Sequence, residues 1–488
     1  MTSPLLWSLI FLQIAIGGFD VAYHHELTER LAWRPSQRRE LALHALRNLL
    51  YAVLFAFFGW FEPRGTWAVL VMTILAVEVV VTLADFVEED LSRKLPASER
   101  INHALLAVNY GAILVLVVPL LLDLAVQDTS LVAVNRGPLS AVATLAAVAV
   151  AGLGVRDAYS AWRAARLQQA QPGDLTRPLV GTQHLLVTGA TGFVGRRMVE
   201  ALTAAGHDVT VLTRDSRKAC ALRPPFRVVT SLDQIANDAS INAIINLAGE
   251  PIAGGLWTRA RRRRILRSRL RVTREVVRLI ARLDKRPDVL VSGSAIGWYG
   301  LWQDEDLTEF DGGKSCFVHR VCEAWERMAM RARSSGVRIV LLRTGLVLGT
   351  DGGFLSRLLP PFEYGLGGPI GSGRQWMSWI ERDDLVRLIA HIIATPNLCG
   401  PVNATAPEPV RNTAFADELG RALRRPAWLR APAPLLHRFA GALADELLIG
   451  GQKVLPAKAE DSGFQFRHAK LASALNAMLG SAGPTAKI

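Results

Sequence analysis

Hydrophobic residues are distributed very unevenly along this chain of 488 residues. Before about residue 155 they form five long runs, whereas after about residue 184 they come in short periodic bursts interrupted by Gly and Pro. Roughly 20 apolar residues span the hydrocarbon core of a bilayer, so these runs predict five transmembrane helices. The predicted spans are Pro4–Ala22, Leu43–Trp60, Trp67–Phe86, Leu105–Val126 and Pro138–Val155.

Basic residues gather in alternate loops of this predicted membrane bundle. The second and fourth loops offer only Arg64 and Arg136. Because basic loops stay in the cytoplasm, the amino terminus is expected outside and the carboxy-terminal part in the cytoplasm of a bacterial-type plasma (inner) membrane. The first span has no basic residue before it and no small-residue cleavage site after it, which is typical of a retained anchor. The first loop, the third loop and the tail after the fifth span carry Arg30, Arg34, Arg38, Arg39, Arg93, Lys94, Arg100, Arg156, Arg163 and Arg166.

Composition agrees with a membrane location. Half of the residues are hydrophobic, and the net charge is +13. Attraction to anionic lipid headgroups accounts for that charge, and since no nucleic-acid recognition motif accompanies it, we expect the lipid bilayer and no nucleic acid as a partner. No pair of cysteines has the spacing of a zinc site, and a reducing compartment argues against disulfides. The cysteines are Cys220, Cys316, Cys322 and Cys399.

The periodic part of the chain begins with one βαβ unit, in "HLLVTGATGFVGRRMVEALTAAGHDVTVLTRDSRK". A buried strand, a glycine turn, an amphipathic helix and a second strand follow one another. A pyrophosphate binds at a helix amino terminus, where unpaired N–H groups and the helix dipole favour negative charge, and side chains there would block its approach. The residues expected to hold a dinucleotide are Gly189, Thr191, Gly192, Phe193, Val194 and Gly195.

The residue after the second strand bears on which dinucleotide is bound. An acidic residue there would accept a hydrogen bond from the ribose 2′-hydroxyl of NAD, whereas an arginine accommodates the 2′-phosphate of NADP. Arg214 stands at this position, with Asp215 adjacent and Arg217 and Lys218 close behind. The sequence therefore favours NADP over NAD, and a solvated basic loop is the alternative interpretation.

Further strands alternate with helices, which predicts an α/β doubly wound, Rossmann-type domain with ligands at the carboxyl ends of its strands. The stretch "AIINLAG" is the predicted fourth strand, and Asn246, Ala248 and Gly249 at its end complete the expected cofactor site. The expected division of the chain is a transmembrane helical domain (1–160), a juxtamembrane linker (161–183), an NADP-binding domain (184–400) and a small substrate-side subdomain (401–488).

Five stretches carry a family resemblance: "TGATGFVG", "INLAGEPI", "VSGSAIGWYG", "LRTGLVLG" and "SGRQWMSWIERDDL". Together they resemble the extended short-chain dehydrogenase/reductase superfamily, and most of all its "epimerase family protein" branch with a carboxy-terminal domain of unknown function. The resemblance covers about residues 184–480. It implies NADP binding, and the branch has no settled substrate.

The resemblance also implies a catalytic Ser, Tyr and Lys, in which the tyrosine exchanges a proton with the substrate. Ser294 matches the serine, with Ser292 as the less favoured choice, but Phe317 and Val321 stand where the tyrosine and lysine belong. Phenylalanine has no exchangeable proton, so the usual acid is absent. Tyr299 is the nearest replacement donor by sequence, and an aromatic lid or a packed loop residue is its alternative role.

Other groups near this site are weaker candidates. His319 and Glu323 would more often be solvated residues of a surface helix than proton donors. The glycine-rich stretch "GLGGPIGSGRQWMSW" follows the sixth strand and carries Arg374 and Trp376. A lid over the substrate is the expected role of this loop.

The predicted spans contain more polar residues than an anchor needs. Residues four apart, such as Glu40 and His44, share a helix face. A layer of carboxylates and histidines is expected near the cytoplasmic ends of the helices. Carboxylate and imidazole ligands on facing helices suit iron, manganese or zinc, whereas helix ends near headgroups are also polar without any ligand. The candidate metal or quinone-like site comprises Asp20, His24, Glu40, His44, Glu78, Asp85, Glu89 and His103, with Glu99 one turn before His103.

Three functions fit these features. The first is a membrane-bound NADP-dependent oxidoreductase or epimerase that acts on a small, lipid-like or membrane-proximal substrate. The second is a membrane protein that senses NADP(H) without turnover, which the missing tyrosine and lysine favour. The third is a metal- or quinone-dependent membrane redox protein fed by the cytoplasmic domain, which would need a one-electron mediator between hydride and metal.

Overall fold

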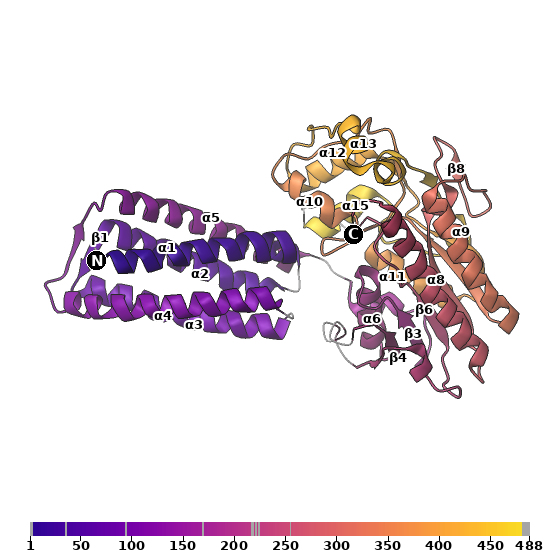
Figure 1. Ribbon diagram of the computed structural model, residues 1–488, viewed down its shortest axis with the longest axis horizontal. Coiled ribbons are helices and arrows are strands. Elements are labelled where there is room, and N and C mark those ends of the chain that lie inside the picture. Colours follow the sequence, from indigo (N-terminus) through magenta and orange to yellow (C-terminus); the bar gives the residue numbers. More distant parts are fainter. Residues whose placement is uncertain are drawn as a thin grey trace, which may run out of the picture. The chain divides into compact units, whose positions relative to one another are not determined.

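The computed structural model describes residues 3–34, 37–92, 95–167, 170–215, 219, 222, 225–253 and 255–480. They form two compact units, Met1–Leu167 and Gln168–Ile488 (Figure 1). Five residues used above lie outside the described residues: Arg93, Lys94, Arg217, Lys218 and Cys220.

Unit 1 is a bundle of five long helices (Figure 1). Each is long and apolar enough to cross a membrane, by length and composition. The first continues as a π-helix, Asp20–Glu29. A short antiparallel ribbon of β1 (Phe61–Arg64) and β2 (Ser130–Ala133) joins the loops at one end. The helices are α1 (Pro4–Phe19), α2 (Arg38–Trp60), α3 (Thr66–Ser92), α4 (Ala97–Ala125) and α5 (Pro138–Arg166).

The fifth helix is longer than its predicted span, which was expected to end at Val155. Arg156 is the first charged residue after the apolar run, and its guanidinium pairs with the carboxylate of Glu26 on the π-helix. Residues 156–166 contain no Pro or Gly, and α5 continues to Arg166 as one helix. The helix thus extends into the juxtamembrane linker that was predicted for 161–183.

Unit 2 is built on a parallel sheet of seven strands in the order β5-β4-β3-β6-β7-β9-β13. The strands β4 and β5 lie on one side of β3, and the later strands, from β6 on, lie on its other side. A doubly wound sheet binds its ligand at the point where the order of the strands reverses in this way. The doubly wound fold predicted for this part is confirmed. The strands are β3 (His184–Thr188), β4 (Asp208–Leu212), β5 (Arg227–Val229), β6 (Ala243–Asn246), β7 (Val289–Ala295), β9 (Arg338–Thr344) and β13 (Gly400–Ala404).

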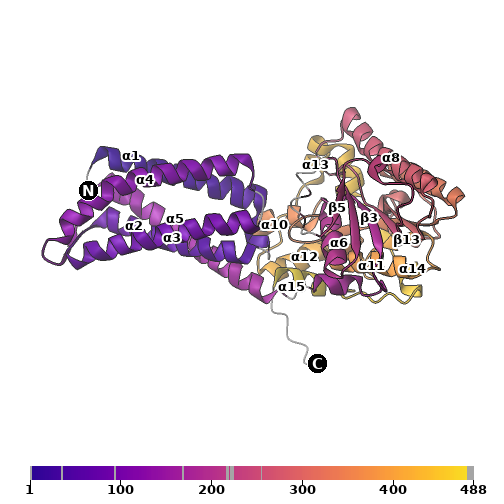
Figure 2. The same ribbon diagram turned by 90° about the horizontal axis from the view of Figure 1, so that it is seen from below.

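Helices cover both faces of this sheet (Figure 2). Alternate residues of a strand point to opposite faces: Leu185 and Val187 of β3 belong to the core under α6 (Phe193–Ala204) and α11 (Arg382–Ala394). Leu186 belongs to the other core, under α8 (Arg259–Arg282) and α9 (Phe317–Ala329). Because both faces are covered, β3 has the continuous apolar run of a buried parallel strand.

Two predicted boundaries shift in the structure. The linker predicted for 161–183 is not free chain, because Leu175 is buried in the core of unit 2 and the Thr176 hydroxyl donates to the Ala201 carbonyl. The boundary predicted at residue 400 falls inside β13, the last strand of the sheet. The carboxy-terminal part therefore begins after Ala404.

That carboxy-terminal part and the loops beside it hold the remaining short elements. Its strands pair with segments of the main domain, as β15 does with β8, so it packs as part of unit 2. The helices are α10 (Leu355–Glu363), α12 (Asn412–Leu423), α13 (Ala433–Ala440), α14 (Ala457–Asp461) and α15 (Leu471–Leu479); the strands are β8 (Asp306–Leu307), β10 (Leu346–Leu348), β11 (Trp376–Met377), β12 (Trp379–Glu381), β14 (Val410–Arg411) and β15 (Lys453–Val454).

Candidate cofactor and active site

The glycine turn between β3 and α6 has no room for side chains at two of its positions. Gly189 has a φ of +70°, and a Cβ there would lie 2.8 Å from the backbone nitrogen of Ala248. A Cβ on Gly195, in the first turn of α6, would lie 2.2 Å from the carbonyl oxygen of Gly189. Gly192 is the amino-terminal cap of α6. These glycines bring the helix amino terminus against the strand ends, which is the geometry that a pyrophosphate requires.

The segment after β6 forms the opposite wall of this crevice. The backbone N–H of Ala248 donates to the Thr188 hydroxyl, 3.3 Å away, which places Ala248 and Gly249 beside the glycine turn. The Asn246 side chain is fully buried and bonds to Thr188 and Thr273. It therefore fixes β6 to its neighbours, whereas the backbone of Ala248 and Gly249 lies beside the glycine turn.

Phe193, at the start of α6, is packed beneath a second glycine-rich loop. A Cβ on Gly349, Gly352 or Gly353 would come within 2.6 Å of its ring. Arg382 stacks over the same ring, 4.9 Å from its centroid. Phe193 thus anchors the loop that follows β10, while its neighbours Thr191 and Val194 are half-buried at the turn.

Arg214 lies two residues beyond the end of β4 and is exposed. The turn before it is closed by the Thr213 hydroxyl, which donates to the carbonyl of Asp215 at 3.1 Å. A guanidinium at this edge is free to meet an anionic group at the end of β4. The structure thus keeps open the role in 2′-phosphate recognition that the sequence predicts for Arg214.

Ser294 belongs to a buried polar network at the carboxyl end of β7. Its hydroxyl donates to Glu326 Oε1 at 2.6 Å. Arg343, from β9, donates to both oxygens of Glu326, at 3.0 Å and 3.1 Å. Neither Glu326 nor Arg343 was predicted, although an arginine inside the buried run "IVLLRTG" is a signal that the sequence offers. Ser294 is thus held by a charged pair and not by a tyrosine.

Tyr299 occupies a closed position in the structure. Its side chain is fully buried, and its hydroxyl lies 2.8 Å from both the Thr308 carbonyl and the Asn403 side-chain oxygen, and 3.2 Å from Arg343. Burial raises the pKa of Tyr299 to about 12. These contacts disfavour the predicted role of proton donor and support the alternative of a packed residue.

The positions of the missing tyrosine and lysine are sealed by apolar side chains. Phe317 and Val321 are buried in a cluster with Trp257 and Ile265, and the ring of Phe317 meets that of Trp257 edge to face. The side chains of Phe317 and Val321 carry neither a charge nor an exchangeable proton, and the nearest charged groups are Arg262, 5.1 Å from the Phe317 ring centroid, and Glu446, which accepts from the Phe317 backbone N–H. The structure therefore puts neither half of the usual acid pair on this face of α9.

The weaker candidates on α9 are engaged elsewhere. His319 Nδ1 contacts the carbonyl of Trp298, and the exposed Glu323 pairs with Arg327 at 2.7 Å. Cys322, one turn after Val318, is buried, and burial raises the pKa of its thiol to about 12. His319 and Glu323 are thus held by other partners.

The predicted lid loop is fixed by polar contacts. The Trp376 indole donates to Asp304 at 2.9 Å. Arg411 pairs with the same carboxylate and stacks over the Trp376 ring, 4.0 Å from its centroid. Arg374 is exposed, and its carbonyl accepts from Arg411. The loop is thus held against the carboxy-terminal part of unit 2.

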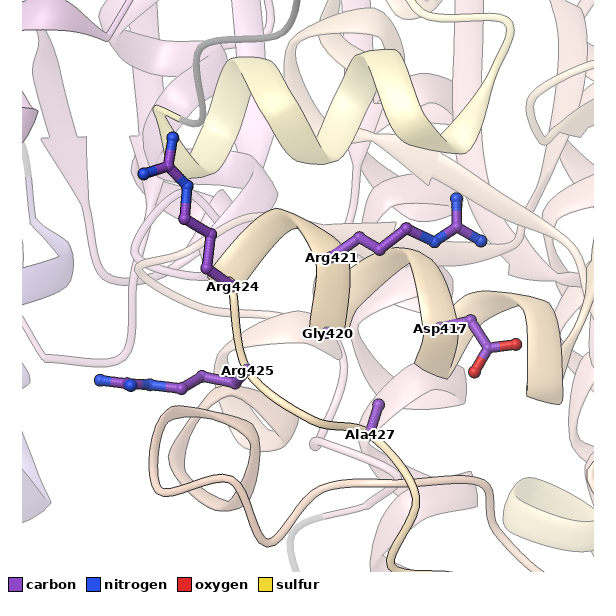
Figure 3. Close-up of a pocket in the computed structure, with 6 residues that line it drawn as sticks. All are labelled: Asp417, Gly420, Arg421, Arg424, Arg425 and Ala427. Carbon is purple, nitrogen blue, oxygen red and sulfur yellow. The ribbon is translucent and has the colours of Figure 1, made fainter.

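A separate hollow lies at the end of α12, lined by Asp417, Gly420, Arg421, Arg424, Arg425 and Ala427 (Figure 3). Arg421 pairs with Glu418 at 2.8 Å. Another hollow, lined in part by Asp174, Arg387 and His391, lies where the segment before β3 meets α11. Residues of the glycine turn line neither hollow, so neither is the cofactor crevice.

The polar residues predicted to form one layer in unit 1 do come together. Asp20 contacts His24, at 2.8 Å, and His103, at 3.2 Å; Asp85 and Glu89 both contact His44. Glu40 joins this group. Glu78 instead accepts from Thr82, one turn along α3, at 2.7 Å, and belongs to neither of the two groups of metal-ligand geometry.

Known proteins resemble unit 2 over most of its length. The NAD dependent epimerase/dehydratase family matches residues 185–403, and a domain of unknown function, DUF1731, matches residues 431–478. The epimerase family protein SDR39U1 homolog of Arabidopsis thaliana, a chloroplastic protein, is 41% identical over 60% of this chain and 86% of its own length. Epimerase family protein YfhF of Bacillus subtilis is 34% identical over 61% of this chain and 98% of its own length.

Solved structures agree with this relationship. The crystal structure of human epimerase family protein SDR39U1 with NADPH is 31% identical, with a TM-score of 0.56, and covers 61% of this chain and 100% of its own. The extended short-chain dehydrogenase/reductase resemblance and the Rossmann-type sheet expected from the sequence are thus confirmed for unit 2. On these identities and coverages, the chain belongs to the NAD dependent epimerase/dehydratase family, with the DUF1731 domain at its carboxy-terminal end.

Proposed function

We propose that the protein is a membrane-attached, NADP(H)-dependent oxidoreductase or epimerase that acts on a small, lipid-like or membrane-proximal substrate. The bundle of unit 1 supports the attachment, because large apolar side chains are exposed along α3, α4 and α5, beyond what water-facing helices carry. They include Val80, Leu83, Val87, Val108, Val115, Leu145 and Val148. In a bilayer these side chains would face lipid.

The alternation of basic loops supports an orientation with the amino terminus outside and unit 2 in the cytoplasm. The bacterial-type plasma membrane is the location that we propose on this basis. A cytoplasmic unit 2 would have access to the NADP(H) pool, and its substrate pocket would face molecules that reach it from the bilayer or from the cytoplasm.

NADP(H) is the cofactor that we propose for the crevice between β3 and β6. The human relative was solved with NADPH. In this chain the glycine turn would hold the pyrophosphate, and the exposed Arg214 is placed at the end of β4, where a ribose 2′-phosphate is recognised in this fold. When bound, the nicotinamide would supply hydride transfer. The chain's own residues would then have to bind the substrate, orient it and move a proton.

Replacing Arg214 by serine tests this choice of cofactor. We expect the NADPH affinity to fall about 10- to 100-fold, because a charge-assisted hydrogen bond contributes about 1.5–3 kcal/mol. The NADH affinity should change by less than about twofold, since NADH has no 2′-phosphate. Calorimetric titration of the full chain in detergent measures both. Arg227→Ser, an exposed arginine at the start of β5, is the control and should leave both affinities unchanged; equal losses for NADPH and NADH would contradict the assignment.

The 2.6 Å hydrogen bond from Ser294 to Glu326 carries the catalytic part of the proposal. A hydroxyl that donates to a carboxylate keeps its own oxygen available as an acceptor for a substrate hydroxyl. In the oxidation direction the substrate proton passes to Ser294 Oγ while the Ser294 proton passes to Glu326. The reverse transfer protonates a substrate oxygen on reduction. Arg343 holds Glu326 in place for this exchange.

Ser294→Ala and Glu326→Gln test this proton route. We expect each to lower kcat about 100-fold, within the range for positioned acid–base groups, without a large change in NADPH affinity. The assay follows NADPH absorbance with the full chain and an extract of membrane lipids as substrate source. Ser292→Ala is the matched control, because this serine faces Asn246 inside the sheet; it should retain kcat within about twofold. A Ser294→Ala protein with unchanged kcat would refute the route.

A second function, NADP(H) sensing without turnover, is favoured by the apolar seal over Phe317 and Val321. Such a protein would bind NADPH and oxidise none of it in the same assay. Limited proteolysis of the full chain with and without NADPH would then show protection in the loops of unit 1. Substrate-dependent oxidation excludes this alternative.

A further inference from the structure

One end of the unit 1 bundle concentrates buried histidines and carboxylates. The four histidines come from the π-helix, α2 and α4, and each is at most 8% exposed. The carboxylates around them come from all of these helices and α3, and each is at most 3% exposed. The histidines are His24, His25, His44 and His103; the carboxylates are Asp20, Glu40, Asp85, Glu89 and Glu99.

The π-helix explains why His25 joins this group, which the sequence did not predict. Hydrogen bonds in a π-helix run between residues five apart, and π-helical turns are frequent at functional sites. This register puts His25 on the same face as Asp20, with Nε2 at 3.4 Å from Asp20 Oδ2 and 3.8 Å from Glu99 Oε1. His25 stacks face to face on His44, with ring centroids 4.5 Å apart.

Two sets of ligand atoms with metal-site geometry share one residue. In the first set, His25, His103, Glu89 and Glu99 each offer an atom within 4.8 Å of all the others. In the second set, Glu40, His44 and Glu89 do the same. Glu89 belongs to both, and a carboxylate has two oxygens, so it is placed to bridge two neighbouring ions. Each set takes at least one histidine and one further carboxylate.

Two histidine nitrogens point into these sets without a hydrogen bond. His25 Nε2 and His44 Nε2 are buried and make no hydrogen bond of good geometry among the described residues, although Asp20 Oδ2 lies 3.4 Å from the first and Asp85 Oδ2 lies 3.1 Å from the second. A nitrogen lone pair aimed at a group of carboxylates is what metal coordination requires. This observation is independent of the clustering of acidic groups.

Further residues would orient the ligands from behind. Asp20 accepts from Asn102 at 2.9 Å and contacts His103 at 3.2 Å. His24, a predicted ligand, uses both of its nitrogens on Asp20 and Ser98. Such carboxylate–histidine contacts fix the ring orientation of a metal ligand. Asp20 and His24 therefore belong behind the ligands, which corrects the ligand role predicted for them.

The charge of this layer calls for cations. Arg47 contacts Asp85 at 2.7 Å and neutralises one carboxylate. The other carboxylates are buried in a bundle that we propose to lie in a bilayer, where buried carboxylates are paired or coordinate metals. Two divalent ions would compensate four negative charges at once. The residues supply oxygen and imidazole ligands without thiolate, a set that suits iron, manganese or zinc.

We propose that unit 1 holds a dinuclear site for divalent first-row transition metal ions, with Glu89 as the bridging carboxylate. One ion is bound by His25, His103 and Glu99, and the other by His44 and Glu40. Paired-metal sites built from carboxylates and histidines on facing helices are a known solution in bundles. The site does not depend on the function proposed for unit 2.

Metal analysis of the full chain tests the site. The protein is purified in detergent without metal-affinity chromatography and its metal content is measured by mass spectrometry. We expect about two ions per chain in the wild type, about one in His44→Ala, and fewer than one in Glu89→Ala. Glu78→Gln is the matched control: Glu78 is as buried as Glu89 on the same helix, but lies about 16 Å away along it at 1.5 Å per residue. Its metal content should equal that of the wild type.

Reloading separates loss of metal during purification from absence of a site. The chain is treated with EDTA, dialysed and mixed with Fe(II), Mn(II) or Zn(II), and thermal unfolding is recorded. Binding to the folded state raises Tm, so the wild type and Glu78→Gln should gain stability and Glu89→Ala should not. NADPH binding by each variant verifies that unit 2 is folded. A wild type that carries no metal and gains no stability from any of the three ions overturns the proposal, as does a Glu89→Ala protein that binds like the wild type; either result would leave a network of hydrogen-bonded ion pairs.

Discussion

Gly195→Val is expected to abolish measurable NADPH binding, a loss of more than about 100-fold. A Cβ at this position would lie 2.2 Å from the Gly189 carbonyl oxygen and 2.8 Å from Ala190 Cα. Both contacts are with backbone, so no side chain can turn away to relieve them. Overpacking of this kind costs about 1–3 kcal/mol or more, and here it would push the α6 amino terminus away from the strand ends. Calorimetric titration of the full chain with NADPH measures the loss.

The matched control for this variant is Gly312→Val. Gly312 is in unit 2, and a Cβ there would meet nothing within 4 Å. The control should bind NADPH with an affinity within about twofold of the wild type, because an open surface position tolerates substitution. Circular dichroism of both variants shows whether unit 2 is folded. A folded Gly195→Val protein that still binds NADPH would show that the crevice at the glycine turn is not the cofactor site.

The glycine turn could be predicted because its signals are local. The strand, the turn and the helix follow one another within 21 residues, His184 to Ala204. Gly195 is required by contacts with its near neighbours, and Gly189 by contacts with the adjacent strand end. The alternation of strands and helices likewise predicted the doubly wound sheet. The boundary at residue 400 was misplaced because "GPVNATA" contains no pattern that shows its pairing with β9, which is a contact over about 60 residues of chain.

The polar network around Ser294 could not be predicted in the same way. Glu326 is 32 residues from Ser294, and Arg343 comes from a different strand. Only the fold brings them together, and a charged residue in a helix such as α9 is more often solvated. Tyr299 was open to two interpretations, a proton donor or a packed residue, and the sequence could not separate them because Arg343 and Asn403, which enclose its hydroxyl, are both distant in the chain.

The bundle of unit 1 shows how helix geometry limits prediction. The spacing of four residues identified Glu40 with His44, and Glu99 with His103, because these pairs lie on regular α-helices. The same rule paired Asp20 with His24 and passed over His25, because residues 20–29 form a π-helix. A π-helix has a different period from an α-helix and therefore turns a different residue toward the layer of histidines and carboxylates. The residue types of "DVAYHHELTE" do not predict that period.

Arg197→Met is expected to lower the free energy of unfolding of unit 2 by about 3–5 kcal/mol. Arg197 on α6 donates to both oxygens of Asp383 on α11, at 2.8 Å each, and also to the Ala170 carbonyl. Arg197 is 7% exposed and Asp383 is 9% exposed, so removal of the guanidinium would leave a buried carboxylate with only the more distant Arg382, at 4.0 Å. Urea unfolding of the full chain in detergent, followed by tryptophan fluorescence, measures the change.

Two further variants separate the cost of an unpaired charge from the loss of a side chain. Arg271→Met removes an arginine whose pair with Glu275 lies at the surface, with the arginine side chain 81% exposed; exposed pairs contribute about 0–1 kcal/mol, so little change is expected. The double variant Arg197→Met/Asp383→Leu removes both buried charges and should recover much of the lost stability, because a hydrophobic pair can replace a buried ion pair at little cost. If the double variant were no more stable than Arg197→Met, packing and the Ala170 contact would account for the loss, and the join between α6 and α11 would depend on shape more than on charge.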